Sequence, residues 1–440
     1  MSIDNINQEG FQRRLDVIAS ILNSYQLEVR QATAVTPVEY EEDCPFPYNN
    51  FIYKIELSSP LGPSTFSAGT PRPGTSAPSK PNVSAIIIRL SNPRANGLNN
   101  AHRVENEVAA QALFRQHLIS NRPTLTHIIP ELYAWEPCRQ PEVSGEAGFG
   151  WTICEFMPGA NLAEQFEGMQ LSQKLDVIEQ VADVLAAVQQ TLLPSQLKGH
   201  FGGLTFDGQG QIIGGQMSIL PGGPWTKYTD LWVSRFRQQL HDADKSSVLK
   251  GWEKSGLRAR IDRLVDAKEV AKLLDGVDTT QKTLIHGDFT LHNFLYDQTT
   301  SRITALLDFD FSWVSHPSHE FFTGLWSIGG GLRSDNDKII TAVLTGKFDE
   351  IDDSLSGKDK DKWQVAQSWN AALVERGAIR PASIAGIDRL RQLMELEDAL
   401  CPSRLGNERA IERLQRQDKL AQAFNAATDK LTALLNDLDS

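Results

Sequence analysis

Two short segments carry the side chains whose types and spacing best suit catalysis. The first, residues 284–295, reads LIHGDFTLHNFL and places Asp288 five positions before Asn293. The second, residues 303–310, is an apolar run that delivers Asp308 near its end. Phosphoryl transfer needs such a set, because one carboxylate orients a hydroxyl proton while other oxygen ligands hold Mg²⁺ against the phosphates. The pattern therefore predicts a phosphotransferase-type site.

The order of these groups matches the protein kinase catalytic loop, H-R-D-x-x-x-x-N. Here His286, Gly287 and Asp288 precede Asn293 at the same offset, so glycine stands in the position of the arginine. That arginine would be the partner of a phosphorylated activation loop, and its loss argues against a conventional protein kinase. A purely structural loop is the alternative, since an aspartate often only caps a turn.

These motifs resemble a known family. HGDFTLHNFL with LLDFD is similar to the aminoglycoside phosphotransferase and choline kinase-like family, and PFPYNNFIYKIEL with HPSHEFF resembles its fungal branch. The resemblance implies a protein kinase-like fold with Asp288 as catalytic base and Asn293 and Asp308 as Mg²⁺ ligands. It also implies that His286 is a packing and hydrogen-bonding element of the loop, and that Glu320 braces the loop.

A kinase-like fold also requires a cation on the third strand and an acid on the next helix. Arg89 lies in the apolar run AIIIRL, and Glu107 lies in the following helical segment, ENEVAAQALF. The guanidinium fork of an arginine can pair with a carboxylate and contact a phosphate. Two alternatives stay open: Arg89 is a strand-end cation that reaches solvent, or Glu105 takes the place of Glu107.

Two further segments are expected to contact the nucleotide. CEFMPG matches the hinge between two lobes, so the backbone of Glu155 and Met157 is expected to meet the adenine edge, although an ordinary strand end fits as well. The loop over the phosphates normally contains glycines, which let backbone N–H groups approach phosphate. Here that loop is 44–50, without glycine, and Asn49 and Asn50 are expected to donate side-chain hydrogen bonds instead.

Other metal chemistries use parts of the same residue set. Four histidines invite a zinc site, although no spacing matches a known zinc signature: His286, His292, His316 and His319. Three carboxylates could form a two-metal hydrolase cluster: Asp288, Asp308 and Asp310. Asp310 is expected either to bind a second Mg²⁺ or to face solvent.

The elements that must position these residues change character near residue 157. Strands are predicted at 51–57, 85–90 and 150–156, and helices at 11–27 and 101–118. Residues 58–84 are rich in Pro, Gly, Ser and Thr, which predicts a flexible insert. We therefore expect an α+β fold with an N-lobe over 1–155.

The remaining residues, 156–440, are expected to form a helical C-lobe that carries the catalytic loop 284–295 and the metal-binding segment 303–310. The strongest helical signal is the apolar spacing over 171–192. A hairpin is predicted at 204–215. Helices are predicted over 228–274 and from residue 335 onward.

Composition bounds the class of protein. The chain has 440 residues, of which 40% are hydrophobic and 22% charged, a globular balance. Its net charge of −12 disfavours nucleic acid as a partner. We see no stretch of about 18 apolar residues that could span a membrane. The four cysteines are far apart, so there is no disulfide framework, and the N-terminus lacks a secretory signal. We expect a cytoplasmic protein.

The sequence thus predicts an ATP- and Mg²⁺-dependent enzyme that phosphorylates a hydroxyl of a small molecule. Two alternatives remain: a catalytically impaired kinase-like binding or regulatory protein, and a biosynthetic enzyme that uses phosphorylation to drive elimination or cyclisation. The acceptor, the choice between ATP and GTP, and the oligomeric state are not fixed by sequence, because specificity lies in segments outside the shared motifs.

Overall fold

A computed structural model describes most of the chain: residues 6–38, 44, 47–67, 71–95, 97–138, 148–332, 337–348 and 357–439. Residues 45–46 of the expected phosphate loop and 68–70 of the expected insert lie outside this description. No helix in the described residues combines the length and apolarity needed to cross a membrane.

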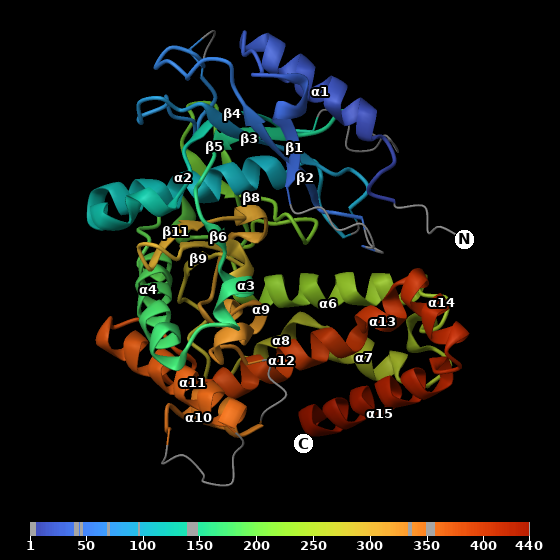
Figure 1. Cartoon of the computed structure of the whole chain (residues 1–440). Helices are drawn as coiled ribbons and strands as arrows, with labels where there is room; N and C mark the ends of the chain where they lie inside the picture. The colour runs from blue at the N-terminus through green and yellow to red at the C-terminus, as the bar shows by residue number, and fades with distance from the viewer. Residues whose placement is uncertain are drawn as a thin grey trace. The chain divides into compact units, whose positions relative to one another are not determined.

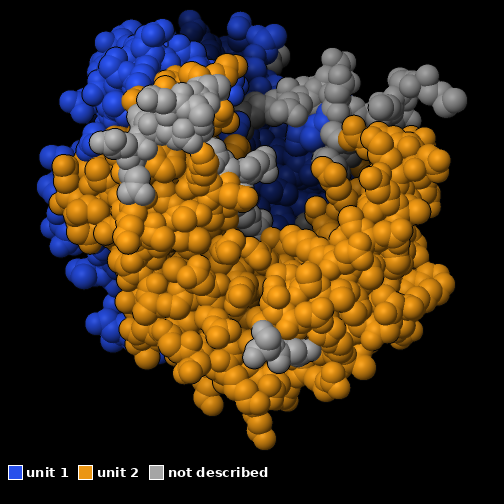
Figure 2. Space-filling view, turned by 90° about the horizontal axis from the view of Figure 1, so that it is seen from below, with its two compact units in different colours: residues 1–224, 283–314 blue, residues 225–282, 315–440 orange. Residues whose placement is uncertain are grey.

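The chain forms two compact units. The first comprises residues 1–224 and 283–314, and the second comprises 225–282 and 315–440 (Figure 2). The first unit therefore contains the strands together with the first part of the segment that was expected to be the C-lobe. The catalytic and metal-binding segments belong to this same unit, whereas the division into lobes at residue 155 stays a prediction.

The first unit is built on a five-stranded antiparallel sheet in the order β1-β2-β3-β5-β4 (Figure 1). Its strands are β1 (Val35–Val38), β2 (Asn50–Glu56), β3 (Ala85–Ser91), β4 (Leu132–Glu136) and β5 (Trp151–Glu155). The three predicted strands are confirmed. The other two were missed: β1 carries a proline and is an edge strand, and β4 is buried on both faces and so lacks polar alternation.

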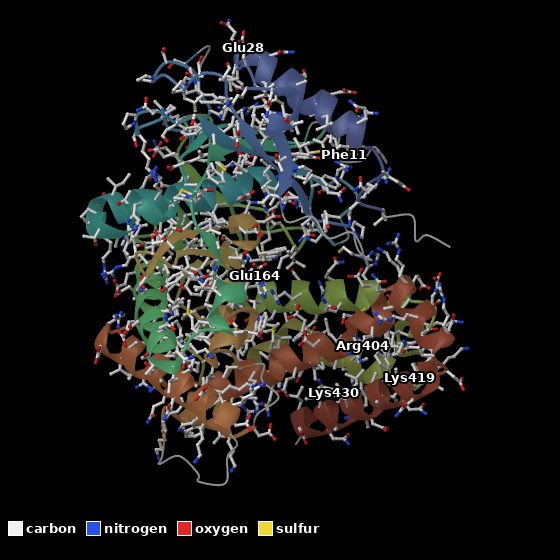
Figure 3. The ribbon with its side chains drawn as sticks, viewed as in Figure 1. Phe11, Glu28, Glu164, Arg404, Lys419 and Lys430 are labelled. Atoms are coloured by element: carbon white, nitrogen blue, oxygen red, sulfur yellow. The ribbon has the colours of Figure 1, made fainter. Side chains whose placement is uncertain are left out.

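Two helices pack on opposite faces of this sheet. Helix α1 (Phe11–Ser24), whose first residue is labelled in Figure 3, packs Ile18 and Leu22 against sheet residues such as Ile55. Helix α2 (Arg103–Asn121) packs Val104 and Val108 against Leu132 and Trp135 (Figure 1). Both helices were predicted, and α2 is the element that must carry Glu107 under the sheet.

The insert 58–84 has no helix or strand among its described residues. Contacts nevertheless tie it to the sheet: Leu61 and Phe66 are buried in the sheet core, and Nε1 of Trp135 donates a 2.9 Å hydrogen bond to the carbonyl of Pro73. The first part and the middle of the insert are therefore anchored, and its flexibility stays a prediction.

The rest of the first unit alternates helices with short strands. Its elements are β6 (Ala160–Asn161), α3 (Leu162–Phe166), α4 (Leu171–Gln189), α5 (Ser195–Lys198), β7 (Gly203–Phe206), β8 (Ile212–Gly215), β9 (Thr283–Ile285), β10 (Phe294–Asp297), β11 (Arg302–Leu306) and β12 (Trp313–Ser315), whose last residue is assigned to the second unit. The predicted hairpin 204–215 is confirmed as β7–β8. Helix α4 ends earlier than predicted, and Leu192 beyond it is 68% exposed because no helix turns it toward the core.

In its described residues, the second unit contains helices and no strand apart from the last residue of β12, and the sequence predicts helices over 228–274 and from residue 335 onward. Its helices are α6 (Tyr228–Lys245), α7 (Arg258–Leu264), α8 (Ala267–Leu273), α9 (Ser318–Thr323), α10 (Asp337–Thr345), α11 (Gly357–Glu375), α12 (Ile387–Leu400), α13 (Ser403–Gly406), α14 (Glu408–Arg416) and α15 (Leu420–Asp439). A buried ion pair joins α6 to α12, with Nη2 of Arg235 lying 2.8 Å from Oε2 of Glu397. The small antiparallel sheet and the helix-rich remainder confirm the predicted α+β class.

Candidate active site

The β10–β11 hairpin brings the two predicted catalytic segments together. Its strands pair Phe294 with Leu306, and beyond that pair the N–H of Leu307 donates a 2.8 Å hydrogen bond to the carbonyl of Asn293. The residues that flank the hairpin are therefore neighbours, which places Asn293 beside Asp308. Strand β10 was not predicted, so sequence alone did not show this adjacency.

The catalytic loop holds Asp288 against Asn293. Nδ2 of Asn293 donates to Oδ2 of Asp288 at 2.9 Å and to its backbone carbonyl at 2.7 Å. Partial burial raises the pKa of Asp288 above its ordinary value, and the hydrogen bond from Asn293 works in the opposite direction. A raised pKa makes the carboxylate a better proton acceptor, as a general base requires.

His286 is an internal support of this loop. The side chain is fully buried, its Nε2 lies 3.0 Å from the carbonyl of Leu307, and its Nδ1 accepts from the N–H of Asp288 at 3.4 Å. Burial lowers the pKa of His286, which favours the neutral ring with the proton on Nε2. These contacts agree with the expected packing and hydrogen-bonding role, and the place of His286 in the catalytic set stays a prediction.

Gly287 stands in the loop for a steric reason. Its φ is 85°, a left-handed conformation that side chains rarely adopt, and a Cβ there would collide with the carbonyl of Phe311. An arginine, as in the protein kinase motif, does not fit this backbone. The glycine of the HGD triplet is thus explained by the close approach of two loops.

Arg89 joins the sheet to the second catalytic segment. Its Nη1 pairs with Oε1 of Glu107, while its Nη2 lies 2.8 Å from Oδ1 of Asp308 and 3.3 Å from Oδ2 of Asp310. The side chain is only 11% exposed, so the solvent-reaching alternative is wrong. Burial opposes the charge on Asp308, yet the adjacent Arg89 holds the pKa of that carboxyl below its ordinary value.

The expected pairing of Arg89 with Glu107 is confirmed, and the alternative partner has another role. Glu105 turns toward β7, where its Oε1 accepts from the hydroxyl of Thr205 at 2.7 Å. Burial raises the pKa of Glu107, and Arg89 opposes that rise. Glu105 and Glu107, two residues apart on α2, thus contact different partners.

A buried asparagine fixes the helix that presents Glu107. Asn106 accepts from the N–H of Leu204 at 2.7 Å and donates from Nδ2 to the carbonyl of Ser312 at 2.8 Å. The hydroxyl of Ser312 in turn donates to the carbonyl of His286 at 3.0 Å. This chain of hydrogen bonds links α2 to the catalytic loop. Sequence reasoning missed Asn106 and Ser312, for which no motif gave a signal.

Asp308 and Asp310 take conformations that suit a binding role. Asp308 has a φ of 61°, an uncommon left-handed geometry for a residue other than glycine. Asp310 is 1% exposed, so the expectation that it could face solvent is wrong. Among the described residues, its Oδ1 is buried without a hydrogen-bond partner, while Oδ2 accepts from Nδ2 of Asn50 at 3.1 Å.

The donor set fits Mg²⁺. Asn293 uses its amide nitrogen for Asp288, which leaves the amide oxygen for a cation, and Asp308 and Asp310 add carboxylate oxygens. Mg²⁺ prefers such hard oxygen ligands and usually completes its shell with water and phosphate oxygens. These three residues would hold the ion, with Asp308 sharing its charge with Arg89.

The loop before β2 is tied to the same cluster by a residue that sequence reasoning missed. Nη2 of Arg103 donates to the backbone carbonyl of Asn49 at 2.5 Å, contacts Oδ1 of Asn50, and lies 3.2 Å from Oδ2 of Asp310. The side chain of Asn50 therefore serves the protein itself, and Asn49 is exposed. The position of Arg103, four residues before Glu107, was the only available signal.

The predicted hinge lies at the end of β5. The N–H of Glu155 donates to the carbonyl of Glu131 at 2.8 Å, and its buried carboxylate pairs with Lys80 of the insert. Met157 is 5% exposed. Because the N–H of Glu155 already donates to Glu131, only the backbone carbonyl oxygen of Glu155 is left to accept a hydrogen bond from adenine.

The zinc and two-metal alternatives find no support. Among the described residues, no three His, Cys, Asp or Glu side chains gather to hold a metal ion. Within the second unit, Nδ1 of His316 lies 2.8 Å from the hydroxyl of Ser318, and Nε2 of His319 lies 2.9 Å from that of Tyr228. These two rings serve the core.

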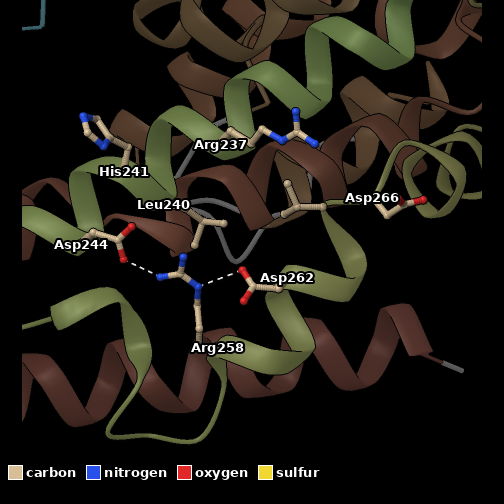
Figure 4. Close-up of a pocket in the computed structure, with 8 residues that line it drawn as sticks. Arg237, Leu240, His241, Asp244, Arg258, Asp262 and Asp266 are labelled. Atoms are coloured by element: carbon tan, nitrogen blue, oxygen red, sulfur yellow. Dashed lines mark hydrogen bonds and ion pairs between the residues drawn. The ribbon is translucent and has the colours of Figure 1, made fainter.

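Two cavities differ in their relation to the predicted residues. A cavity of about 280 Å³ between α6 and α7 holds Arg258, which pairs with Asp244 and with Asp262, the latter at 2.8 Å (Figure 4). It contains none of the predicted site residues. A larger cavity of about 580 Å³ in the first unit has Asn50 and Asp308 in its wall and thus reaches the catalytic cluster.

Comparison with known sequences gives one family match. Residues 80–338 match the family described as phosphotransferase enzyme family, a segment that covers more than half of the chain. Among curated proteins, no sequence matches the chain. The kinase-like α+β class expected from the resemblance agrees with this match, and the resemblance to a fungal branch stays a prediction.

Three solved structures resemble the fold distantly. A protein of Ralstonia eutropha JMP134, described as a candidate aminoglycoside phosphotransferase, is 14% identical, with TM-score 0.47 and 97% of this chain and 98% of that one covered. The streptomycin–ATP complex of APH(2'')-IIa is 9% identical, with TM-score 0.42 and coverage of 91% and 95%. An ethanolamine kinase of Plasmodium vivax is 12% identical, with TM-score 0.38 and coverage of 90% and 85%. These likenesses are too distant to assign a substrate.

Proposed function

This chain belongs to the phosphotransferase enzyme family, whose model matches residues 80–338, and we propose that it transfers the γ-phosphoryl group of ATP to a hydroxyl of a small molecule with the help of Mg²⁺. One observation carries the proposal: Asp288, Asn293 and Asp308 meet at the base of the β10–β11 hairpin, and Arg89 joins them from β3.

Asp288 acts on the acceptor. Its carboxylate orients the acceptor hydroxyl and takes the proton, while the hydroxyl oxygen forms a bond to the γ-phosphorus and the bond from that phosphorus to the bridging oxygen of ADP breaks. The pKa of Asp288, raised by burial, favours this proton transfer. Asn293 fixes the orientation of the carboxylate through its 2.9 Å hydrogen bond.

The phosphates are bound by charge. Asn293, Asp308 and Asp310 would hold Mg²⁺, which when bound neutralises phosphate charge as the bond to ADP breaks. Arg89 supplies a fixed cation from the sheet, and Glu107 keeps that guanidinium in place. Such preorganised charges act strongly in a site sheltered from water.

The nucleotide base and the loop complete the site. The carbonyl of Glu155 and the N–H of Met157 are proposed to meet the adenine edge, as the hinge motif predicts. Asn49 and Asn50 are proposed to lie over the phosphates. Asn50 must then exchange its 3.1 Å hydrogen bond to Asp310 for one to phosphate.

A second candidate is a kinase-like binding protein without turnover. The observation that favours it is the occupation of the metal-ligand carboxylates by the protein itself: Arg89 on Asp308 and Asn50 on Asp310. A biosynthetic enzyme that phosphorylates in order to drive elimination or cyclisation would use the same site, and only its product would differ.

Thermal unfolding with a non-hydrolysable ATP analogue, with and without Mg²⁺, separates the first two candidates. The enzyme should be stabilised by the analogue mainly when Mg²⁺ is present, because ligand binding to the folded state raises stability. Turnover is then followed with kanamycin and ethanolamine as hydroxyl-bearing probes, and mass spectrometry identifies a phosphorylated or rearranged product.

The matched variants are Asp288→Asn and Asp176→Asn, the second on the exposed face of α4. Loss of a general base should lower kcat by about 10²–10⁴-fold in the first and leave the second unchanged. Turnover that survives Asp288→Asn would refute the assigned mechanism. Mg²⁺-independent binding without any product would favour the binding protein.

A further inference from the structure

A second buried arginine, Arg103, connects three parts of the first unit. It is the first residue of α2 and 1% exposed, yet no strand or motif marks it as a functional position. Through a single nitrogen, Nη2, it reaches the carbonyl of Asn49 at 2.5 Å, Oδ1 of Asn50, and Oδ2 of Asp310 at 3.2 Å. The helix, the loop before β2 and the metal-binding segment therefore meet at one guanidinium.

Two atoms at this meeting point are left unsatisfied. In the described part of the chain, neither Nη1 of Arg103 nor Oδ1 of Asp310 has a hydrogen-bond partner, and both are buried. A buried polar atom without a partner is costly, and such exceptions in folded proteins call for a functional explanation. The two residues that carry these unsatisfied atoms already contact each other, because Nη2 of Arg103 lies 3.2 Å from Oδ2 of Asp310. Both unsatisfied atoms therefore belong to one cluster.

The loop itself explains why an arginine is needed. A glycine-rich loop holds its shape and approaches phosphate through its backbone, whereas residues 47–50 contain no glycine. Here Asn92 does part of this work: its backbone N–H donates to the carbonyl of Asn49 at 2.9 Å, and its side-chain Nδ2 donates to that of Tyr48 at 2.6 Å. Arg103 donates to the same carbonyl of Asn49 and adds a contact with the side chain of Asn50.

We propose that Arg103 is a positioning residue that fastens the glycine-free loop 47–50 to Asp310, so that the loop and the metal-binding segment are held in register for a Mg²⁺–nucleotide. The part that concerns Mg²⁺ rests on the proposed function. The fastening of the loop does not, because the contacts exist in the protein alone.

The proposal distinguishes Arg103 from Arg89. Arg89 faces Asp308 and Glu107 and is proposed to contact phosphate. Arg103 acts through Asn50 and Asp310, and its removal should loosen the loop and weaken metal binding more than it slows the chemical step. Lysine cannot replace it fully, since its shorter side chain ends in a compact ammonium group instead of a planar guanidinium.

Hydrogen–deuterium exchange on the nucleotide-free protein tests the fastening directly. In Arg103→Met, amides of a peptide covering residues 47–53 should exchange about tenfold faster, the change expected when about 1.4 kcal/mol of local stabilisation is lost. A peptide covering β3 should be unchanged and thus report intact folding. Arg94→Met is the matched control, since Arg94 lies between β3 and α2, close in sequence to Arg103, and pairs at the surface with Glu9 at 2.5 Å.

Thermal unfolding with the non-hydrolysable ATP analogue tests the metal side. The Mg²⁺ concentration that gives half of the maximal stabilisation should rise about tenfold in Arg103→Met, because Asp310 loses its anchor. Arg103→Lys should restore most of this Mg²⁺ dependence through its charge but should not restore the protection of the loop. A merely structural arginine would not separate these two readouts.

Each outcome decides the matter. Loop exchange in Arg103→Met equal to that of the wild type overturns the proposal. If the wild type binds the analogue, an Mg²⁺ dependence in Arg103→Met equal to that of the wild type overturns it as well. If Arg103→Met does not fold, Asn50→Ala should reproduce the faster loop exchange, and unchanged exchange there is equally fatal. A wild type that never responds to Mg²⁺ and the analogue refutes the proposed function, while the exchange comparison still tests Arg103.

Discussion

Nη2 of Arg89 lies 2.8 Å from Oδ1 of Asp308, although 219 positions of sequence separate the two residues. The same guanidinium holds Glu107 through its other terminal nitrogen. The carboxylate expected to bind a metal ion is therefore neutralised by the protein's own cation. A bound Mg²⁺ must share Asp308 with Arg89 or take its place, which couples metal binding to the position of this arginine.

Replacing Arg89 should test that coupling. Arg89→Met removes charge-assisted hydrogen bonds worth about 1.5–3 kcal/mol each and should lower kcat/KM for Mg²⁺–ATP by about 10–100-fold. The kcat/KM of Arg89→Lys should lie between those of the wild type and Arg89→Met, because one ammonium group cannot pair with carboxylates on two segments at once. Steady-state kinetics measure this, with Arg72→Met, a surface variant that breaks an ion pair to Glu136, as control. Wild-type kinetics in Arg89→Met would contradict the role.

The pH dependence of kcat should reveal the base. Burial raises the pKa of Asp288, so the acid limb of the profile should lie above the ordinary aspartate value of about 3.9. Activity should fall as pH falls through that pKa, because the protonated carboxyl cannot accept a proton. In Asp288→Asn the limb should vanish from the residual activity. An acid limb that persists in this variant would assign the titration to another group.

The same shift has a consequence for stability. A carboxyl whose pKa is raised on folding binds more protons in the folded state, so its contribution to the free energy of unfolding is lost as pH rises through the raised pKa. Asp288→Asn should therefore increase the free energy of unfolding at neutral pH but not below about pH 4. Urea unfolding at both pH values measures the difference, and a variant less stable at neutral pH would contradict it.

Gly287→Ala should disable the catalytic loop. A residue with a side chain at φ 85° costs about 1–2 kcal/mol, and the added Cβ would also collide with the carbonyl of Phe311. Gly276→Ala is a matched control, since Gly276 has a φ of 81° but no atom within 4 Å of the added Cβ. Urea unfolding should show a larger loss in the free energy of unfolding for Gly287→Ala than for Gly276→Ala. Equal losses would mean that the close approach is unimportant.

The buried pair of Arg235 and Glu397 should control the stability of the second unit. Both side chains are 8% exposed, and Arg235→Met would leave Glu397 charged and without its cation. Breaking such a pair costs about 3–5 kcal/mol, whereas replacing both partners by apolar residues is often neutral. Arg235→Met with Glu397→Leu should therefore recover most of the loss in denaturant unfolding. A double variant as unstable as the single one would contradict this account.

Local motifs were readable from sequence because their chemistry needs fixed spacing along the chain. His286, Asp288 and Asn293 lie within one loop, so their order already set their proximity. The apolar periods of α1, α2 and α4 were equally visible, since a helix repeats its buried face every three to four residues.

Strands β1, β4 and β10 escaped sequence analysis for different reasons. β1 is an edge strand with a proline, and β4 is buried on both faces. β10 has only four residues, FLYD, whose alternating burial does not appear as alternating polarity in the sequence. The pairing of β10 with β11 is nevertheless what sets Asn293 beside Asp308.

The sequence by itself determined the kind of site: a carboxylate and an amide at catalytic-loop spacing, a later aspartate, and a cation with an acid upstream. Only the tertiary structure decided which of these groups touch. In the fold, Arg89 pairs with Glu107 and not with Glu105, and Asp310 is buried. The fold also places Arg103 and Asn106 in contact with the catalytic segments. The physical reason is that buried charges and amides must find partners wherever the fold places them, and those partners lie far away along the chain.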